Sequence, residues 1–376
     1  IMQSADLKEY TEDFYTKAME AFLTSEEKNL VCSPLNLYMA LAILAETSEG
    51  ETRSQVLELL GEETIDSLRT HASAVWQANY DDNPVLKCHL ANSLWLNSDI
   101  TYKEPLLDTL TSGYFADIFS GTMGTEKMDE ALQKWTDEHT GGLLSEYISD
   151  IKTDPEAVME LISAIYFKAT WIDKFNKDDN TTETFHGLNG DTECDMMHMS
   201  GSDIYFWGDR FTAALMGIAE GYSMYFILPD EGEELSDVIS DPQVFELIKY
   251  GNSMEYENNK YIIVNKSIPK FSISSKIDAK EILESLGIKD AFDSSAADFT
   301  PVTDLDGIYI SKVDHAAMVE IDEEGVTGAA YTDIMYAGAG MPPEEEVDFV
   351  LDRPFMYVIT APDGSLLFAG TVYDLD

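Results

Sequence analysis

A stretch near the end of the chain, from Val326 to Gly340, most constrains the fold. It has no proline and a single charged residue, Asp333, in a protein that is 25% charged. Only the residues from Val347 to Asp376 follow its closing proline pair and acidic run, which is too few for a second domain. Those residues have the pattern of strands, which must pair with strands that come earlier. The stretch is therefore a long loop inside one domain, and such loops are usually functional.

The same stretch has the two-residue alternation of a strand. One face would carry small or apolar residues, namely Val326, Gly328, Ala330, Thr332, Ile334 and Tyr336. The opposite face would carry Thr327, Ala329, Tyr331, Asp333, Met335 and Ala337. The only charge lies on the second face, and no proline interrupts the hydrogen bonds of a ladder. The pattern predicts a loop that can also become a strand buried on one face.

The whole chain, residues 1–376, is predicted to be a single domain. No Gly/Ser-rich or Pro-rich linker divides it, and an apolar content of 44% is enough for a large core. The chain has 23 basic and 71 acidic residues, a formal net charge of −48, so nucleic acids and anionic membranes are poor partners. A cationic partner is favoured, although the charge could serve solubility alone.

The cysteines and histidines do not predict a catalytic or metal site. Cys32, Cys88 and Cys194 are scattered, so no disulfide framework is expected. Cys88 precedes His89, but both belong to a predicted strand, where neighbouring residues face opposite ways. No G-x-S-x-G, H-E-x-x-H or phosphate-binding loop is present. We therefore expect no catalytic residue, no cofactor and no metal.

Periodicity predicts a mixed order of helices and strands. No apolar run approaches the length of a membrane span, and the first 22 residues are acidic and amphipathic, unlike a signal peptide. Helical spacing is found at 7–22, 35–45, 51–60 and 65–80, and the second of these is apolar almost all round. Strands are predicted at 86–96, at 158–167 and in a closing hairpin at 356–372.

Several motifs occur in the order in which serpins carry them. They are N-L-V-C-S-P-L at 29–35, Y-F-K-A-T-W at 166–171, I-P-K-F at 268–271, E-E-G at 323–325, R-P-F at 353–355 and L-F-A-G at 367–370. Together they resemble the serpin family, and we expect an acidic, prokaryotic-type inhibitory member. The resemblance implies an α+β fold of one domain with three β-sheets and eight or nine helices. It also implies an exposed reactive-centre loop at about 323–346.

The resemblance also implies a reactive bond. In serpins, the residue before the cut lies sixteen positions after the acidic residue that aligns with Glu323, which gives Ala339–Gly340. Pro342 and Pro343 are then the third and fourth residues after the cut, as the family pattern requires. The flanking specificity residues would be Tyr336, Ala337, Gly338 and Met341. The hinge would comprise Glu323, Glu324, Gly325, Val326, Thr327, Gly328, Ala329 and Ala330, with Val326 entering the sheet first.

A second implied group controls how the main sheet opens. Its members would be Ser33, Ser163, His315, Trp171 and Lys270, with Lys270 also the salt-bridge partner of Glu323. Ser163 stands where the family usually has asparagine, so the hydrogen bonds of this group must differ from the family pattern.

The function implied by the resemblance is suicide inhibition of a serine protease. Small residues before the cut favour an elastase-like or subtilisin-like target, and the charge favours a cationic one. A non-inhibitory serpin of the chaperone or storage type, and an inhibitor of cysteine proteases, are the alternatives. We expect a monomer that works outside the cell. The predicted helix at 65–80 holds one arginine and no basic cluster, so no heparin site is expected.

Overall fold

The computed structural model describes residues 4–142, 144–253, 255–311, 313–326 and 345–375. The predicted reactive bond and half of the predicted hinge, from Thr327 to Ala330, lie outside these residues.

The helix α2, Pro34–Thr47, is the most buried helix of the molecule. Ser33 caps it, because its hydroxyl accepts a hydrogen bond from the N–H of Asn36, and Pro34 fits the first turn, where no N–H partner is required. Every residue of α2 except Ala40 is buried. The other α-helices in the described part of the chain are α1 Ser4–Leu23, α3 Gly50–Leu60, α4 Ile65–Asn79, α5 Glu104–Gly113, α6 Glu126–His139, α7 Ser145–Ile148, α8 Leu235–Ile239, α9 Pro242–Tyr250 and α10 Lys280–Ser285.

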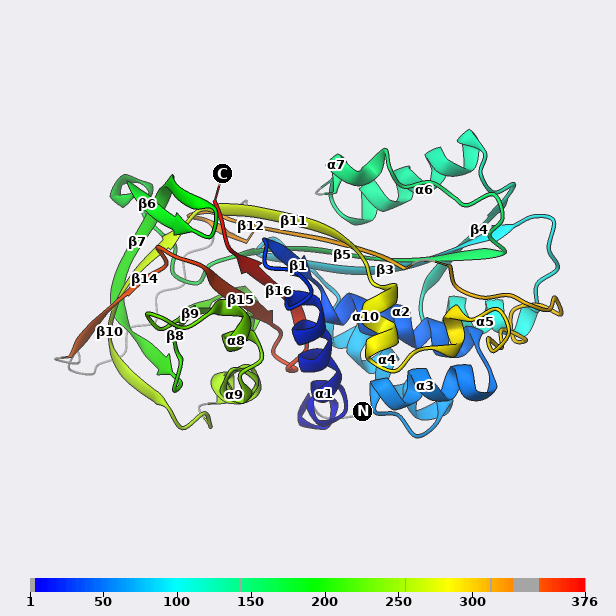
Figure 1. Cartoon of the computed structure of the whole chain (residues 1–376), viewed down its shortest axis with the longest axis horizontal. Coiled ribbons are helices and arrows are strands. Elements are labelled where there is room, and N and C mark those ends of the chain that lie inside the picture. Colours follow the sequence, from blue (N-terminus) through cyan, green and yellow to red (C-terminus); the bar gives the residue numbers. More distant parts are fainter. Residues whose placement is uncertain (1–3, 143, 254, 312, 327–344, 376) are drawn as a thin grey trace.

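A seven-stranded sheet forms the middle of the molecule (Figure 1). Its strands are β2 Asp81–Asp82, β3 Leu86–Asn97, β4 Ala116–Gly121, β5 Met159–Thr170, β11 Phe271–Asp278, β12 Asp314–Ile321 and β13 Gly325–Val326. The order is β11-β12-β13-β5-β3-β2, and β4 pairs with β3 in parallel. β12 alternates between buried and partly exposed residues, as expected of a strand that covers the core on one face.

A nine-stranded sheet forms one end of the molecule. Its strands are β1 Leu30–Cys32, β6 Thr181–Gly187, β7 Gly190–Trp207, β8 Phe211–Gly217, β9 Ser223–Pro229, β10 Asn259–Pro269, β14 Glu346–Val350, β15 Phe355–Thr360 and β16 Leu366–Val372. The long strand β7 pairs with β6 and β10 along most of its length and with β8 only at its end. The resemblance implies three sheets, but the described strands form two, because β7 pairs with β6, β8 and β10 and joins them in one sheet.

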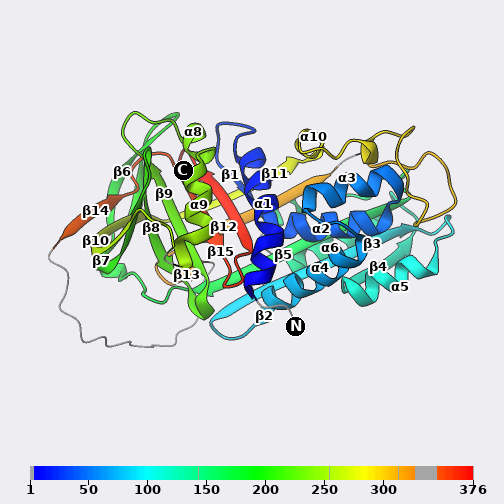
Figure 2. The same cartoon turned by 90° about the horizontal axis from the view of Figure 1, so that it is seen from below.

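Helices cover both faces of the seven-stranded sheet. Figure 1 shows α6 and α7 on one face and α2 to α5 on the other, and Figure 2 shows α2 to α5 from below. On the α6 side, Met128, Leu132 and Trp135 form a separate buried cluster with Trp95 of β3 and Ala164 of β5. The helix α6 therefore lies across the strands β3 and β5.

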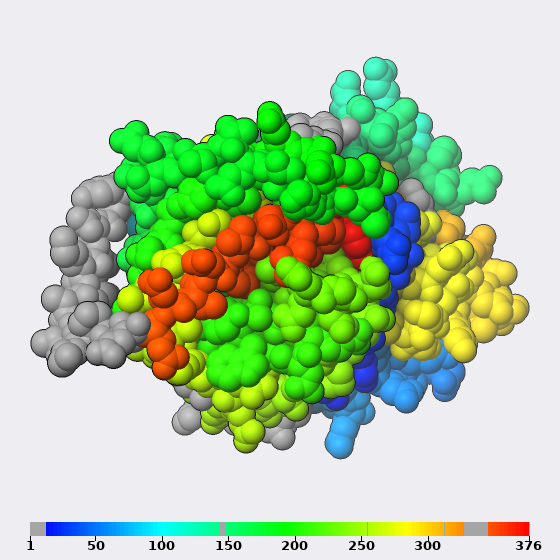
Figure 3. All heavy atoms as spheres, turned by 60° about the vertical axis from the view of Figure 1, so that its left-hand side comes forward, coloured from blue at the N-terminus to red at the C-terminus, as the bar shows by residue number. Residues whose placement is uncertain are grey.

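The chain re-enters the described part of the structure at residue 345, at the end of the molecule that carries the nine-stranded sheet. β14 pairs in parallel with β10, and Figure 3 shows this orange segment against the yellow-green residues of β10. No helix among the described residues is long and apolar enough to span a bilayer.

Candidate functional site

A tight turn joins β12 to β13 and positions the predicted hinge. The carboxylate of Asp322 accepts hydrogen bonds from the N–H groups of Glu324 (2.8 Å) and Gly325 (3.2 Å). The N–H of Asp322 in turn donates to the carbonyl of Gly325 at 3.0 Å. An aspartate that accepts from backbone N–H groups two residues on stabilises a chain reversal. The chain therefore turns back at once, and Gly325–Val326 run antiparallel to β12.

The two residues of β13 already lie between β5 and β12. Val326 pairs with Ile321 of β12 on one side and with Ala169 of β5 on the other. Its side chain is only 2% exposed, on the core face of the sheet. In the described residues, β5 and β12 are paired with β13 but not with each other. From the sequence, Val326 was expected to enter the sheet first; here it is in the sheet before any cleavage.

The base of the hinge is held by the carboxylate of Glu323, which is 4% exposed. Lys270 donates to its Oε1 at 3.1 Å, and the amide of Asn180 donates to the same oxygen at 2.5 Å. Burial raises the pKa of Glu323, but hydrogen bonds from its own backbone N–H, Lys270 and Asn180 outweigh burial and lower the pKa overall. Glu323 is thus a charged anchor that joins the hinge to β10–β11 and to the segment before β6.

Trp171 and Glu324 hold the other side of the turn. The indole N–H of Trp171 donates to the carbonyl of Asp322 at 2.8 Å, and its backbone N–H donates to the carbonyl of Glu324 at 3.0 Å. The carboxylate of Glu324 pairs with Lys174 at 2.8 Å and is partly exposed. The turn is therefore fixed to the segment that follows β5 by backbone and side-chain bonds together.

The other predicted members of the sheet-opening group lie under the sheet, at the start of α2. The N–H of Ser33 donates to Nε2 of His315 on β12 at 3.0 Å. The imidazole also packs edge-on against Phe22, with the ring centroids 5.1 Å apart. Trp171 and Lys270 belong to the turn around β13 instead, so the structure divides the predicted group into two.

Ser163 of β5 contacts two asparagines that the sequence motifs did not indicate, Asn36 of α2 and Asn92 of β3. Its Oγ lies 2.6 Å from Oδ1 of Asn36 and 2.8 Å from Oδ1 of Asn92, and its one proton can serve one of them. The amide of Asn36 also donates to the carbonyl of Ser163 at 3.1 Å. The start of α2 is therefore bonded both to β12, through His315, and to β5, through Ser163. Any separation of β5 from β12 must rearrange these bonds.

The burial of His315 makes the fold sensitive to acid. Burial lowers the pKa of His315 to about 4. Because the pKa of an unfolded histidine is about 6.5, the unfolded chain binds the proton first as the pH falls. We expect this residue to reduce the free energy of unfolding by about 1.4 kcal/mol per pH unit between about pH 6.5 and about pH 4. Urea unfolding at several pH values, compared between the parent and His315→Gln, measures the contribution.

The control for His315 is His186→Gln. His186 is exposed, and a hydrogen bond from its ring to Asp191 raises its pKa, so its effect on stability has the opposite sign. A pH dependence that is unchanged in His315→Gln would show that another group sets the acid sensitivity.

The residues that could suggest hydrolytic chemistry do not form a catalytic pair. Cys88 is fully buried on the core face, and burial raises the pKa of its thiol, whereas His89 lies on the opposite face of β3. His315 contacts the backbone N–H of Ser33, and the hydroxyl of Ser33 caps α2 instead. Among the described residues, no group of three or more His, Cys, Asp or Glu side chains is arranged to hold a metal ion.

The predicted reactive bond Ala339–Gly340 and its flank Tyr336, Ala337, Gly338 and Met341 lie outside the described residues. So do the hinge residues Thr327, Gly328, Ala329 and Ala330.

Comparison with known proteins identifies the family. The family model for Serpin (serine protease inhibitor) matches residues 9–375. The chain belongs to the serpin family. Serpin-ZX of Arabidopsis thaliana is 28% identical, with 93% of each chain covered. The leukocyte elastase inhibitor of Homo sapiens is also 28% identical, with 94% of this chain and 96% of the human protein covered.

Solved structures superpose on this serpin over nearly the whole length of the chain. The native state of the thermophilic serpin tengpin superposes with a TM-score of 0.84 at 27% identity, covering 100% of this chain and 95% of tengpin. Human thyroxine-binding globulin, solved with its ligand, has the same TM-score of 0.84 at 22% identity, with 99% of each chain covered. The second match shows the fold alone. The α+β serpin fold expected from the motifs is confirmed.

Proposed function

We propose that this serpin is an irreversible inhibitor of a serine protease and acts as a suicide substrate. The observation that carries the proposal is β13, in which Val326 lies buried between β5 and β12. Strand edges that are not paired with each other can accept an added strand through their free N–H and C=O groups. Insertion of the reactive loop in this way is the known inhibitory mode of serpins.

In the proposed reaction, the serine of the protease attacks the carbonyl carbon of Ala339. The peptide bond to Gly340 breaks, the amine of Gly340 leaves with a proton, and Ala339 becomes an ester on the protease. The freed loop then extends β13, with every second residue from Val326 facing the core. Those residues include Gly328, Ala330 and Thr332, which are small enough for a covered sheet face. The inhibitor itself contributes no catalytic group.

The target that fits the sequence best is an elastase-like or subtilisin-like protease. Ala337, Gly338 and Ala339 precede the proposed cut and suit a small specificity pocket, whereas a trypsin-like pocket would lack its cation. The human leukocyte elastase inhibitor among the relatives supports this class of target. A monomeric state and a location outside the cell remain predictions from the family.

Mixing the serpin with a panel of serine proteases is expected to give a complex that survives SDS with elastase or subtilisin. Mass spectrometry should find the released fragment of 37 residues, Gly340 to Asp376. Trypsin should be inhibited more slowly, and Ala339→Arg should reverse that order because it supplies the missing cation.

Three other results of this panel would contradict the proposal. Cleavage without a stable complex would indicate a non-inhibitory serpin of the storage, chaperone or ligand-binding type. A stable complex formed only with cysteine proteases would place the target in another class. A released fragment of another length would move the reactive bond away from Ala339.

The acidity of the chain predicts a salt-dependent association rate. With a net charge of −48, the serpin should attract a basic protease over a distance set by the ionic strength, about 8 Å under physiological conditions. We expect the association rate constant to fall steadily as sodium chloride is raised. Stopped-flow measurement with a basic and an acidic protease of the same class checks this. A rate that does not change with salt would show that the charge serves solubility alone.

A further inference from the structure

A pair of lysines, of which only Lys87 has an ion-pair partner among the described residues, lies on the outer face of the seven-stranded sheet. Lys168 of β5 is directly opposite Lys87 of β3 in the ladder. Directly opposed residues have Cβ atoms about 5 Å apart, and like charges at such positions destabilise a sheet. Lys168 is half-buried and forms no ion pair or hydrogen bond with any described residue. In a chain with 71 acidic residues against 23 basic ones, such a pair is unexpected.

The two lysines line a hollow of about 240 Å³ at the top of β3 and β5. Its other walls are apolar or hydroxyl-bearing side chains and backbone, from Pro84, Val85, Leu86, Tyr166, Ala169 and Thr170. The turn after α6 packs against one of these walls, Tyr166: a Cβ on Gly141, whose φ is +62°, would lie 2.3 Å from the ring of Tyr166. The hollow thus has two lysines among the residues of its wall.

A third nitrogen group lies next to the hollow. His89 is directly opposite Tyr166 in the same ladder, and the two rings are 5.8 Å apart. Its Nε2 is buried without a hydrogen-bond partner among the described residues. The nearby carboxylate is Asp82, whose Oδ1 is 3.6 Å from this nitrogen and 3.6 Å from Nζ of Lys87. The two lysines and the histidine therefore have one nearby carboxylate among the described residues, that of the half-exposed Asp82.

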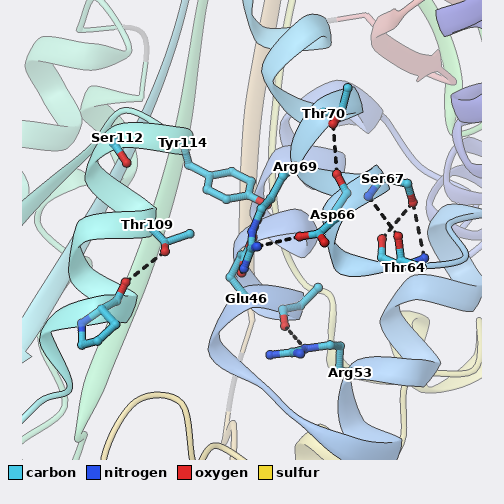
Figure 4. A network of polar contacts seen from close by, with 12 residues as sticks. Glu46, Arg53, Thr64, Asp66, Ser67, Arg69, Thr70, Thr109, Ser112 and Tyr114 are labelled. Carbon is cyan, nitrogen blue, oxygen red and sulfur yellow. Dashed lines mark hydrogen bonds and ion pairs between the residues drawn. The ribbon is translucent and has the colours of Figure 1, made fainter.

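A second hollow, of about 410 Å³ between α2, α4 and α5, shows how this chain normally neutralises its cations. Arg69 donates to both carboxylate oxygens of the buried Glu46, at 2.6 and 2.9 Å, and to Asp66 at 2.8 Å (Figure 4). Lys103 pairs with Asp304 at 2.7 Å. An anion could bind there only by displacing protein carboxylates. At Lys168 there is no such carboxylate to displace, and Lys87 has a single, longer contact with the exposed Asp82 at 3.6 Å.

We propose that the hollow between Lys87 and Lys168 binds a small tetrahedral oxyanion, a phosphate group. Ammonium groups act as point charges that suit phosphate, whereas a planar carboxylate is matched better by an arginine fork. A bound phosphate removes the repulsion between the lysines. It also contacts the strand that holds the hinge, because Ala169 and Thr170 line the hollow and pair with Val326 and Gly325. The site does not depend on protease inhibition.

Isothermal titration calorimetry with inorganic phosphate and with glycerol phosphate, at constant ionic strength, tests the site. The parent should bind at least one of them saturably, and the tighter of the two identifies the source as free phosphate or a phosphate ester. Lys168→Met should weaken binding by at least about tenfold, since a hydrogen bond to a charged group is lost. The control Lys127→Met removes an exposed lysine of α6 that has no ion pair with a described residue, and should bind like the parent.

Unfolding of the unliganded proteins provides an independent measurement. Without phosphate, Lys168→Met should be at least as stable as the parent, because the repulsion with Lys87 is gone. A parent that binds neither anion, or a Lys168→Met variant that binds as the parent does, would overturn the proposal. A clear loss of stability in unliganded Lys168→Met would also overturn it, because Lys168 would then be a structural residue.

Discussion

Replacing Val326 with arginine is expected to turn the serpin from an inhibitor into a substrate. Val326 is 2% exposed and lies between Ile321 and Ala169, on the face that meets the core. A charge forced toward that interior costs several kcal/mol unless it escapes to water. Insertion of the cleaved loop should then be slower than hydrolysis of the ester, so that the protease cuts after Ala339 and leaves. The moles of serpin consumed per mole of protease blocked should rise many-fold.

The same substitution should also weaken the uncleaved protein. From the sequence alone, Val326→Arg would be expected to leave its stability unchanged, because the loop would lie outside the sheet before cleavage. The buried position of Val326 changes this expectation: removing a buried valine from the core costs about 1.5–3 kcal/mol. Urea unfolding of the uncleaved variant measures this loss separately from inhibition.

Thr327→Arg is the matched control, because the alternation in the sequence predicts that position 327 faces the opposite way once the loop becomes a strand. It should remain largely inhibitory. Equal inhibition by the two variants would show that the loop does not insert in the register set by β13, and the proposed mechanism would then be wrong.

Much of the scaffold around the site could be predicted because it depends on local patterns. The apolar run after Ser33-Pro34 predicts a buried helix with its cap, and α2 begins and is buried accordingly. The continuous apolar run of β5 predicts a strand covered on both faces, and α2 and α6 contact its two faces. The helical spacing of Met128, Leu132 and Trp135, followed by Thr140-Gly141-Gly142, likewise predicts a helix, and α6 ends at His139.

The contacts that define the site could be predicted less well, because they join distant residues. Asn36 is the single amide side chain in the apolar helix α2, which indicates that it has a polar partner. The partner could not be predicted, because the hydrogen bond to Ser163 spans 127 positions. The turn residues Asp322 and Gly325 were visible, yet only the pairing of β13 on both sides shows that the hinge is already in the sheet. The opposition of Lys87 and Lys168 likewise follows from the register of β3 with β5.

Gly325 leaves room for β13 between β5 and β12, and Gly325→Ala is expected to displace β13. A Cβ at this position would lie 2.1 Å from the carbonyl oxygen of Ala169 and 2.8 Å from Cα of Thr170. Both are backbone atoms, so no side-chain rotation can relieve the contact. Overpacking of this kind costs about 1–3 kcal/mol, and the loss of Val326 burial adds about 1.5–3 kcal/mol if the strand leaves the sheet. Urea unfolding should show a fall in stability of that order.

Gly201→Ala is the control, because Gly201 also lies in a strand, β7, but a Cβ there would have no atom within 4 Å. Its free energy of unfolding should stay within about 1 kcal/mol of the parent, as expected for glycine to alanine without a clash. Hydrogen exchange should be faster in Gly325→Ala for peptides that cover β13 and the end of β5, and unchanged in Gly201→Ala. The cleaved loop must also seat position 325 against Ala169, so Gly325→Ala should consume more serpin per protease blocked. If Gly325→Ala is as stable and as inhibitory as Gly201→Ala, then β13 is not held between β5 and β12 in solution, and the hinge enters the sheet only after cleavage.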